Sequence, residues 1–74
     1  MTLTPNEADA LERLARGELV REIAAAWHRT GTVVYRTLTT ASQALGAQTY
    51  YEAVSIWTAM RSRRDTDSNA GGDA

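Results

Sequence analysis

Apolar residues return every three or four positions in four segments of this chain, which is the spacing of a helix with one buried face. In the third segment, Val34, Leu38, Ala41 and Leu45 are separated by four, three and four positions. The other segments show the same period. The pattern therefore predicts an all-α fold, with helices over residues 5–16, 19–27, 31–45 and 50–61.

Capping signals mark the ends of these segments. Thr4 and Glu7 have the spacing of a capping box before the first helix, and Thr49 and Glu52 repeat it before the fourth. Glycine follows the first and third helices, where a left-handed backbone is commonly needed. After the second helix, His28 stands in the turn, and we expect it to take a positive φ because histidine tolerates that region better than most residues.

The second and third predicted helices are joined by only three residues, 28–30. Two helices with so short a connection form the helix-turn-helix unit. In its DNA-binding versions the second helix of the pair enters the major groove, while the first crosses the backbone. Four helices by themselves indicate only a small bundle, a fold that serves many purposes.

Six short motifs follow one another along the chain: LTPNE, a glycine after the first helix, EIA, VVYRTL, ALG and EAV. Together they resemble the LuxR/GerE-type DNA-binding domain, whose pattern they follow over residues 3–54 without a gap. The resemblance implies a four-helix helix-turn-helix domain that binds DNA through its third helix and commonly dimerises through its fourth. The chain departs from the family pattern at Thr32 and Tyr35, which replace phosphate-facing lysines, and at Val33 and Thr37, where threonine and histidine are usual.

Charge is unevenly distributed over the 74 residues. Residues 65–74 carry three aspartates and no basic residue, a composition that predicts a disordered acidic tail. Residues 1–64 then form a single helix-turn-helix domain with eight arginines against six acidic residues, a balance of +2. The formal net charge of the whole chain is −1, which is low for a protein that binds nucleic acid.

Residues that carry chemistry are few. The chain has no cysteine and one histidine, so we expect no metal, no cofactor and no enzymatic activity. Glu18 and Glu22 lie four positions apart and indicate a solvated helix face rather than a catalytic pair. No apolar run approaches the ~20 residues that span a bilayer, and no signal peptide is recognisable. We therefore expect a cytoplasmic protein, with which the absence of cysteine is compatible.

The candidate DNA-contacting residues lie on and around the third predicted helix. Arg36 is the best-placed reader of a base edge, because arginine pairs with guanine in the major groove, and Tyr35 and Thr39 flank it. Hydroxyls near the start of this helix and basic residues before it are candidates for phosphate contacts. These are Thr30, Thr32, Arg21 and Arg29. A solvated surface is the alternative for the three arginines, and capping is the favoured role of Thr30.

Both tryptophans lie on apolar helix faces. We expect Trp27 to be buried where the helices meet. Ile56, Trp57 and Met60 make the last helix more apolar than a small monomer needs, and they predict a homodimer contact. Packing into the core is the alternative for these three residues.

The sequence thus predicts a small transcriptional regulator that binds double-stranded DNA sequence-specifically and carries out no reaction. The alternative is a protein-interaction module that binds another transcription regulator or RNA polymerase. The preserved order of motifs favours DNA binding, whereas the sparse basic residues favour the interaction module.

Overall fold

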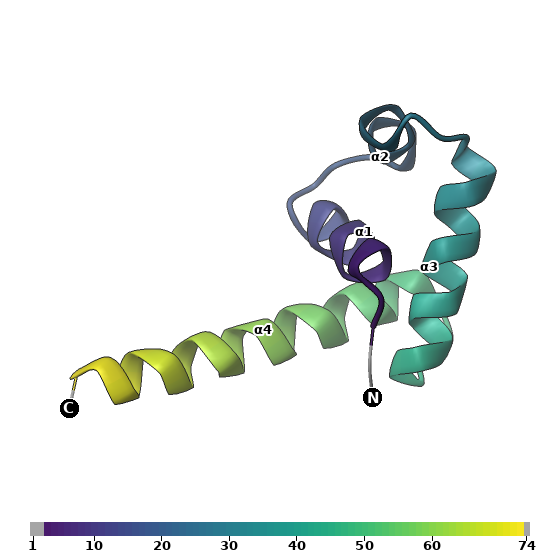
Figure 1. Cartoon of the computed structure of the whole chain (residues 1–74). Helices are drawn as coiled ribbons and strands as arrows, with labels where there is room; N and C mark the ends of the chain where they lie inside the picture. Colours follow the sequence, from purple (N-terminus) through teal and green to yellow (C-terminus); the bar gives the residue numbers. More distant parts are fainter. Residues whose placement is uncertain (1–2, 74) are drawn as a thin grey trace.

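The computed structural model describes the backbone of residues 3–73 and the side chains of residues 3–62. The chain forms four helices, α1 (Pro5–Ala15), α2 (Val20–Trp27), α3 (Gly31–Leu45) and α4 (Tyr50–Asp73) (Figure 1). No strand occurs anywhere in this backbone, which confirms the all-α prediction. The bounds of α3 agree with the prediction, and those of α1 and α2 differ from it by one residue at one end.

Side-chain caps begin the helices where the sequence predicted them. The Thr4 hydroxyl accepts from the backbone N–H of Glu7 at 3.2 Å, and the Glu7 carboxylate accepts from the backbone N–H of Thr4 at 2.8 Å. This completes the capping box of α1. At the start of α4, the Thr49 hydroxyl accepts from the backbone N–H of Glu52 at 3.2 Å. These bonds occupy amide groups that a helix start leaves without a partner.

Three helices end in the same motif, with a left-handed residue just after the last turn. These residues are Gly17, His28 and Gly46, with φ of 94°, 57° and 71°. In each case the next amide reaches back to a carbonyl five positions earlier; after α2, the Arg29 N–H donates to the Ala24 carbonyl at 2.9 Å. This is the Schellman arrangement. The positive φ predicted for His28 is confirmed, and it turns the chain from α2 into α3.

The hydrophobic core draws on all four helices. Leu11 of α1, Ile23 of α2, and Val34 and Leu38 of α3 are the largest side chains that are fully buried. Alanines allow the helices to approach closely, and Ala53 of α4 is completely inaccessible to solvent. The remaining members of the core are Ala10, Ala24, Ala41 and Leu45. The core is small, so each of these contacts is a large share of the domain's stability.

The burial of Trp27 differs from the prediction. It packs against the core but is only partly buried, and it does not plug the centre of the bundle. Its indole N–H donates to the Asp9 carboxylate at 2.7 Å. Asp9 is itself only partly buried, so the indole edge that binds it lies near the surface.

Helix α4 packs against the body with its first half and then runs away from it, which gives the chain an elongated shape of 46 × 24 × 19 Å (Figure 1). It continues past residue 61 to Asp73, so it is longer than predicted. The side chains of residues 63–74 lie outside the described part, and the division into a domain and an acidic tail at residue 65 stays a prediction. Among the helices that the structure describes, none is long and apolar enough to cross a membrane.

Candidate nucleic-acid interface

The exposed face of α3 brings together four of the residues predicted to contact DNA. Thr32, Tyr35, Arg36 and Thr39 are all exposed, whereas Val34 and its partners at helical spacing are buried. Two further exposed residues, Thr40 and Gln43, extend this face toward the C-terminal end of the helix. We call these six residues the α3 face. The sequence prediction did not include the last two.

The start of α3 confirms the favoured role of Thr30. Its hydroxyl oxygen accepts from the backbone N–H of Val33 at 3.4 Å and caps the helix. Arg29 and Thr32 on either side of this cap are exposed. The first amide groups of the helix carry the positive end of its dipole, so this end favours an anion such as phosphate.

Several hydroxyls of α3 are bonded within the helix itself. Thr39 donates to the Tyr35 carbonyl at 3.0 Å, and Thr40 donates to the Arg36 carbonyl at 3.0 Å. Thr37 does the same with the Val33 carbonyl at 2.9 Å, in a partly buried position. These bonds restrict what the threonines can offer to a ligand, because each hydroxyl has a single hydrogen.

A group of three tyrosines joins the α3 face to the start of α4. The rings of Tyr35 and Tyr50 meet edge to face with centroids 6.1 Å apart, and those of Tyr50 and Tyr51 stack at 4.4 Å. The hydrogen bond from the Tyr50 hydroxyl to Tyr51, together with partial desolvation, raises the pKa of Tyr50 to about 12. Tyr50 is therefore neutral at physiological pH. The adjacent tyrosines at the start of the fourth helix were the available sequence signal, and the prediction missed them.

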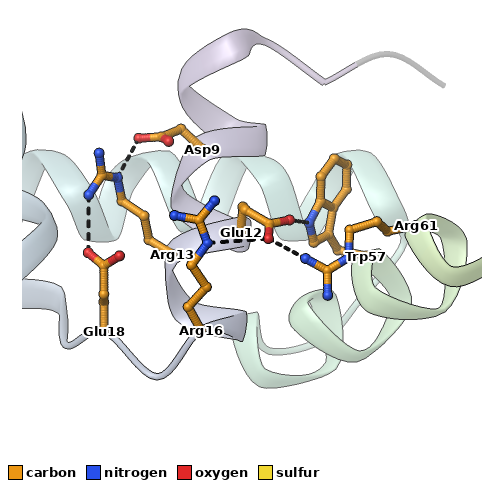
Figure 2. Close-up of polar contacts among 7 residues, drawn as sticks. All are labelled: Asp9, Glu12, Arg13, Arg16, Glu18, Trp57 and Arg61. Atoms are coloured by element: carbon orange, nitrogen blue, oxygen red, sulfur yellow. Dashed lines mark hydrogen bonds and ion pairs between the residues drawn. The ribbon is translucent and has the colours of Figure 1, made fainter. Parts of the chain in front are cut away.

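The arginines divide into two groups. Arg13 binds Asp9 at 2.8 Å and Glu18 at 3.1 Å, while Arg16 and Arg61 both bind Glu12 (Figure 2). The other arginines with described side chains are Arg21, Arg29 and Arg36. These three are exposed and form no ion pair with any described residue. The free positive charge of the described chain thus lies on α2, the turn and α3.

Helix α1 holds the two tryptophans through its acidic side chains. The Glu12 carboxylate accepts the indole N–H of Trp57 at 3.0 Å and also binds Arg61, so it ties α4 to α1 (Figure 2). The hydrogen bond from Trp57 is the main cause that lowers the pKa of Glu12, and the bond from Trp27 lowers the pKa of Asp9 in the same way. Both acids stay charged at neutral pH and neutralise arginines outside the α3 face.

The predicted dimer residues divide between core and surface. Ile56 and Trp57 are partly buried and pack against the core of their own chain. Met60 has 39% of its surface exposed. The core-packing alternative thus describes the first two residues, and Met60 remains the exposed apolar side chain of the set.

Two surface grooves flank the start of α4. One, of about 410 Å³, lies between the end of α3 and Tyr50–Tyr51, and its lining includes Thr39, Gln43 and Gln48. The other, of about 280 Å³, is lined by Leu14, Leu19, Tyr51 and Val54, together with Gly17, Glu18 and Tyr50. Among the described side chains, no three acidic or histidine residues gather as they would around a metal ion.

Comparison of this chain with protein-family models, with curated proteins and with solved structures gave no match.

Proposed function

We propose that this chain is a cytoplasmic transcriptional regulator that binds double-stranded DNA with α3 in the major groove. The observation that carries the proposal is the distribution of free charge. The arginines of α1, and Arg61 of α4, are neutralised by acidic partners, whereas Arg21, Arg29 and Arg36 of the helix-turn-helix unit are exposed and pair with no acidic residue among the described side chains. Exposed arginine without a partner is what contact with phosphates and guanine requires.

Each free arginine has a role set by its position. Arg36 lies in the second turn of α3, on its exposed face, where a side chain reaches base edges. Arg29 precedes the N-terminus of α3, and Arg21 lies in the first turn of α2. Residues at these places of a helix-turn-helix unit contact the DNA backbone and fix its register. Tyr35, held by Tyr50, adds a rigid amphipathic contact at the edge of the same face.

The order of motifs from LTPNE to EAV supports the same function through its resemblance to the LuxR/GerE-type domain. By the same resemblance we propose a homodimer formed through α4. Of the three residues predicted for this contact, Met60 is the one whose side chain is exposed. Sedimentation velocity across a wide concentration range tests this part, and a strict monomer both free and on DNA would contradict it.

The protein-interaction module has one observation in its favour. Leu19 and Tyr51 are exposed by 49% and 72%, and they border the 280 Å³ groove with Leu14 and Val54. An exposed apolar groove of this kind suits a partner helix. It lies beside α1 and α4, so it would remain available while α3 contacts DNA, and it makes a second candidate function for a different surface.

The dependence of binding on salt tests DNA binding without knowledge of the operator. Few free arginines per protomer predict a shallow fall of log K with log salt, with a slope on the order of two to four per protomer. Arg21→Ala and Arg29→Ala should each reduce this slope by roughly one unit. Arg16→Ala is the matched control, because Arg16 is exposed but already paired with Glu12. No binding to mixed duplex DNA even at low salt would contradict the proposal and favour the interaction module.

A further inference from the structure

The exposed threonines in the middle of α3 are committed as hydrogen-bond donors inside the helix. Thr39 gives its hydrogen to the Tyr35 carbonyl and Thr40 gives its hydrogen to the Arg36 carbonyl, each at 3.0 Å. A hydroxyl has one hydrogen and two lone pairs. What these side chains present to a ligand is therefore an acceptor oxygen beside a methyl group, and no donor.

An acceptor has few complements on duplex DNA. Phosphate oxygens are themselves acceptors, and so are O6 and N7 of guanine and O4 of thymine. In the major groove only the amino groups of adenine (N6) and cytosine (N4) donate. A threonine that is back-bonded in this way can therefore pair with an amino group, but it cannot pair with a phosphate unless it first gives up its bond within the helix.

Resting on the DNA-binding function proposed above, we infer that Thr39 and Thr40 determine base preference by accepting hydrogen bonds from amino groups of adenine or cytosine. The two threonines carry acceptors next to Arg36, which carries only donors. The two threonines thereby add acceptors beside the donors of Arg36, on a face that has a single charged residue among its six.

In contrast, the hydroxyls at the start of α3 are available as hydrogen-bond donors. The Thr30 oxygen accepts from the Val33 amide, which leaves the hydroxyl hydrogen available. The Thr32 hydroxyl makes no hydrogen bond to any part of the chain that the structure describes. Both can donate to a phosphate. Helix α3 is thus divided along its length, with donors for the backbone in its first turn and acceptors for bases in its third.

The spacing limits where the amino group lies. Arg36 and Thr40 are one helical turn apart, about 6 Å along the axis. This corresponds to roughly two base-pair steps of 3.4 Å each. We therefore expect the amino group read by Thr40 to lie within about two base pairs of the guanine read by Arg36.

The test uses the full chain and the duplex that it selects from a random library. Thr39→Val and Thr40→Val keep the shape of the side chain and remove the oxygen. Thr39→Ser and Thr40→Ser keep the oxygen, and Thr37→Val removes a back-bonded hydroxyl that is partly buried beside the α3 face. In parallel, single adenines are replaced by purine and single cytosines by 2-pyrimidinone, which deletes one amino group at a time.

We expect each valine variant to raise Kd roughly 2- to 10-fold, the range for loss of one hydrogen bond. Deleting the matching amino group should cost the parent protein the same factor, and should cost the valine variant nothing further. The serine variants and Thr37→Val should bind as the parent does. Purine, 2-pyrimidinone and their natural counterparts thus identify the contacted base directly.

The failures are distinguishable. If the chain does not bind the library at all, even at low salt, the DNA-binding function itself is wrong; if it binds without selecting a sequence, DNA binding stands and this inference is overturned. If a duplex is selected but no amino deletion removes the effect of Thr39→Val or Thr40→Val, DNA binding stands and the inference is overturned. If the effect is instead removed by 7-deaza substitution of a purine, the threonines donate to N7, which also overturns it.

Discussion

At the scale of single residues, His28 holds a backbone conformation that favours glycine. Its φ of 57° and ψ of 44° place it in the left-handed region, at the position that Gly17 and Gly46 occupy after α1 and α3. A side chain in this region crowds the following carbonyl, which glycine avoids. The turn of the helix-turn-helix unit therefore carries a local strain that the two other helix ends do not.

Replacing that residue should stabilise the domain. We expect His28→Gly to raise the free energy of unfolding by about 0.5–1 kcal/mol, because relief of strain exceeds the entropy cost of glycine. Gly46→Ala is the matched control and should lower the free energy by about 1 kcal/mol. Apart from Gly46 and its chain neighbours, no heavy atom lies within 4 Å of an added Cβ at Gly46, so this cost is one of local backbone conformation. Urea unfolding measures both, and a destabilised His28→Gly variant would show that the imidazole has a stabilising contact.

At the scale of elements, most helix starts and ends follow from local signals. The capping signals act over only four or five positions, so the sequence was enough to place α1, α2 and α3. These signals are Thr4 with Glu7, Thr30, and the left-handed residue after each of these helices. The end of α4 lacked such a signal: neither proline nor glycine occurs from residue 50 to residue 70, and the helix passes residue 61. The threonine back-bonds are also local, and they were predictable from the i−4 rule.

Contacts between side chains of different helices were not predicted from the sequence. Glu12 and Trp57 are 45 positions apart, and no periodicity reveals that a carboxylate on α1 meets an indole on α4. The same holds for Asp9 and Trp27. Tyr35 was predicted to contact DNA, but its contact with Tyr50 depends on the angle between α3 and α4. The residues on the exposed face of α3 were thus predictable from the sequence, whereas the contact with Tyr50 that holds Tyr35 was not.

The link between α1 and α4 should depend on pH. Hydrogen bonding to Trp57, and then the charge of Arg61, hold the pKa of Glu12 below its ordinary value of 4.5. A carboxyl whose pKa is lowered on folding contributes stability that is present above its unfolded pKa and is lost as pH falls through the folded value. The contribution of Glu12 is therefore complete at neutral pH and declines below about pH 5.

Trp57→Phe tests this link by removing the indole donor while keeping an aromatic ring. The variant should be less stable than the parent at pH 7, and the difference should narrow as pH falls from about 5 to 3, because protonation of Glu12 removes its charge and weakens the bond in the parent. Tyr51→Phe changes a side chain that hydrogen-bonds no carboxylate of the described chain, so it should differ from the parent by a constant amount. Thermal unfolding across this pH range is the measurement. A difference for Trp57→Phe that does not change with pH would contradict the role of Glu12.

At the scale of the whole molecule, the net charge is small, but the paired and the unpaired arginines lie on different parts of the described chain. The formal net charge of −1 suggests poor affinity for a polyanion, but Asp9 and Glu12 of α1 are engaged with the arginines of α1 and α4. The positive charge that remains unpaired in the described chain lies on the helix-turn-helix unit. Composition alone could not separate these two groups of arginine. This separation of paired from unpaired arginines supports binding through a few specific contacts, with weak affinity for DNA regardless of its sequence.

Binding of DNA through α3 is tested most directly by comparing Arg36→Ala with Arg16→Ala on a selected duplex and on random duplexes. Arg36→Ala should weaken binding to the selected duplex by about 1–3 kcal/mol and relax its preference at one base position. Its effect on random duplexes should be smaller, because a base contact adds little where the base is wrong. Arg16→Ala should bind both as the parent does. Equal losses for Arg36→Ala on both kinds of duplex would make Arg36 a phosphate contact, and parent-like binding by Arg36→Ala to the selected duplex would contradict the placement of α3 in the major groove.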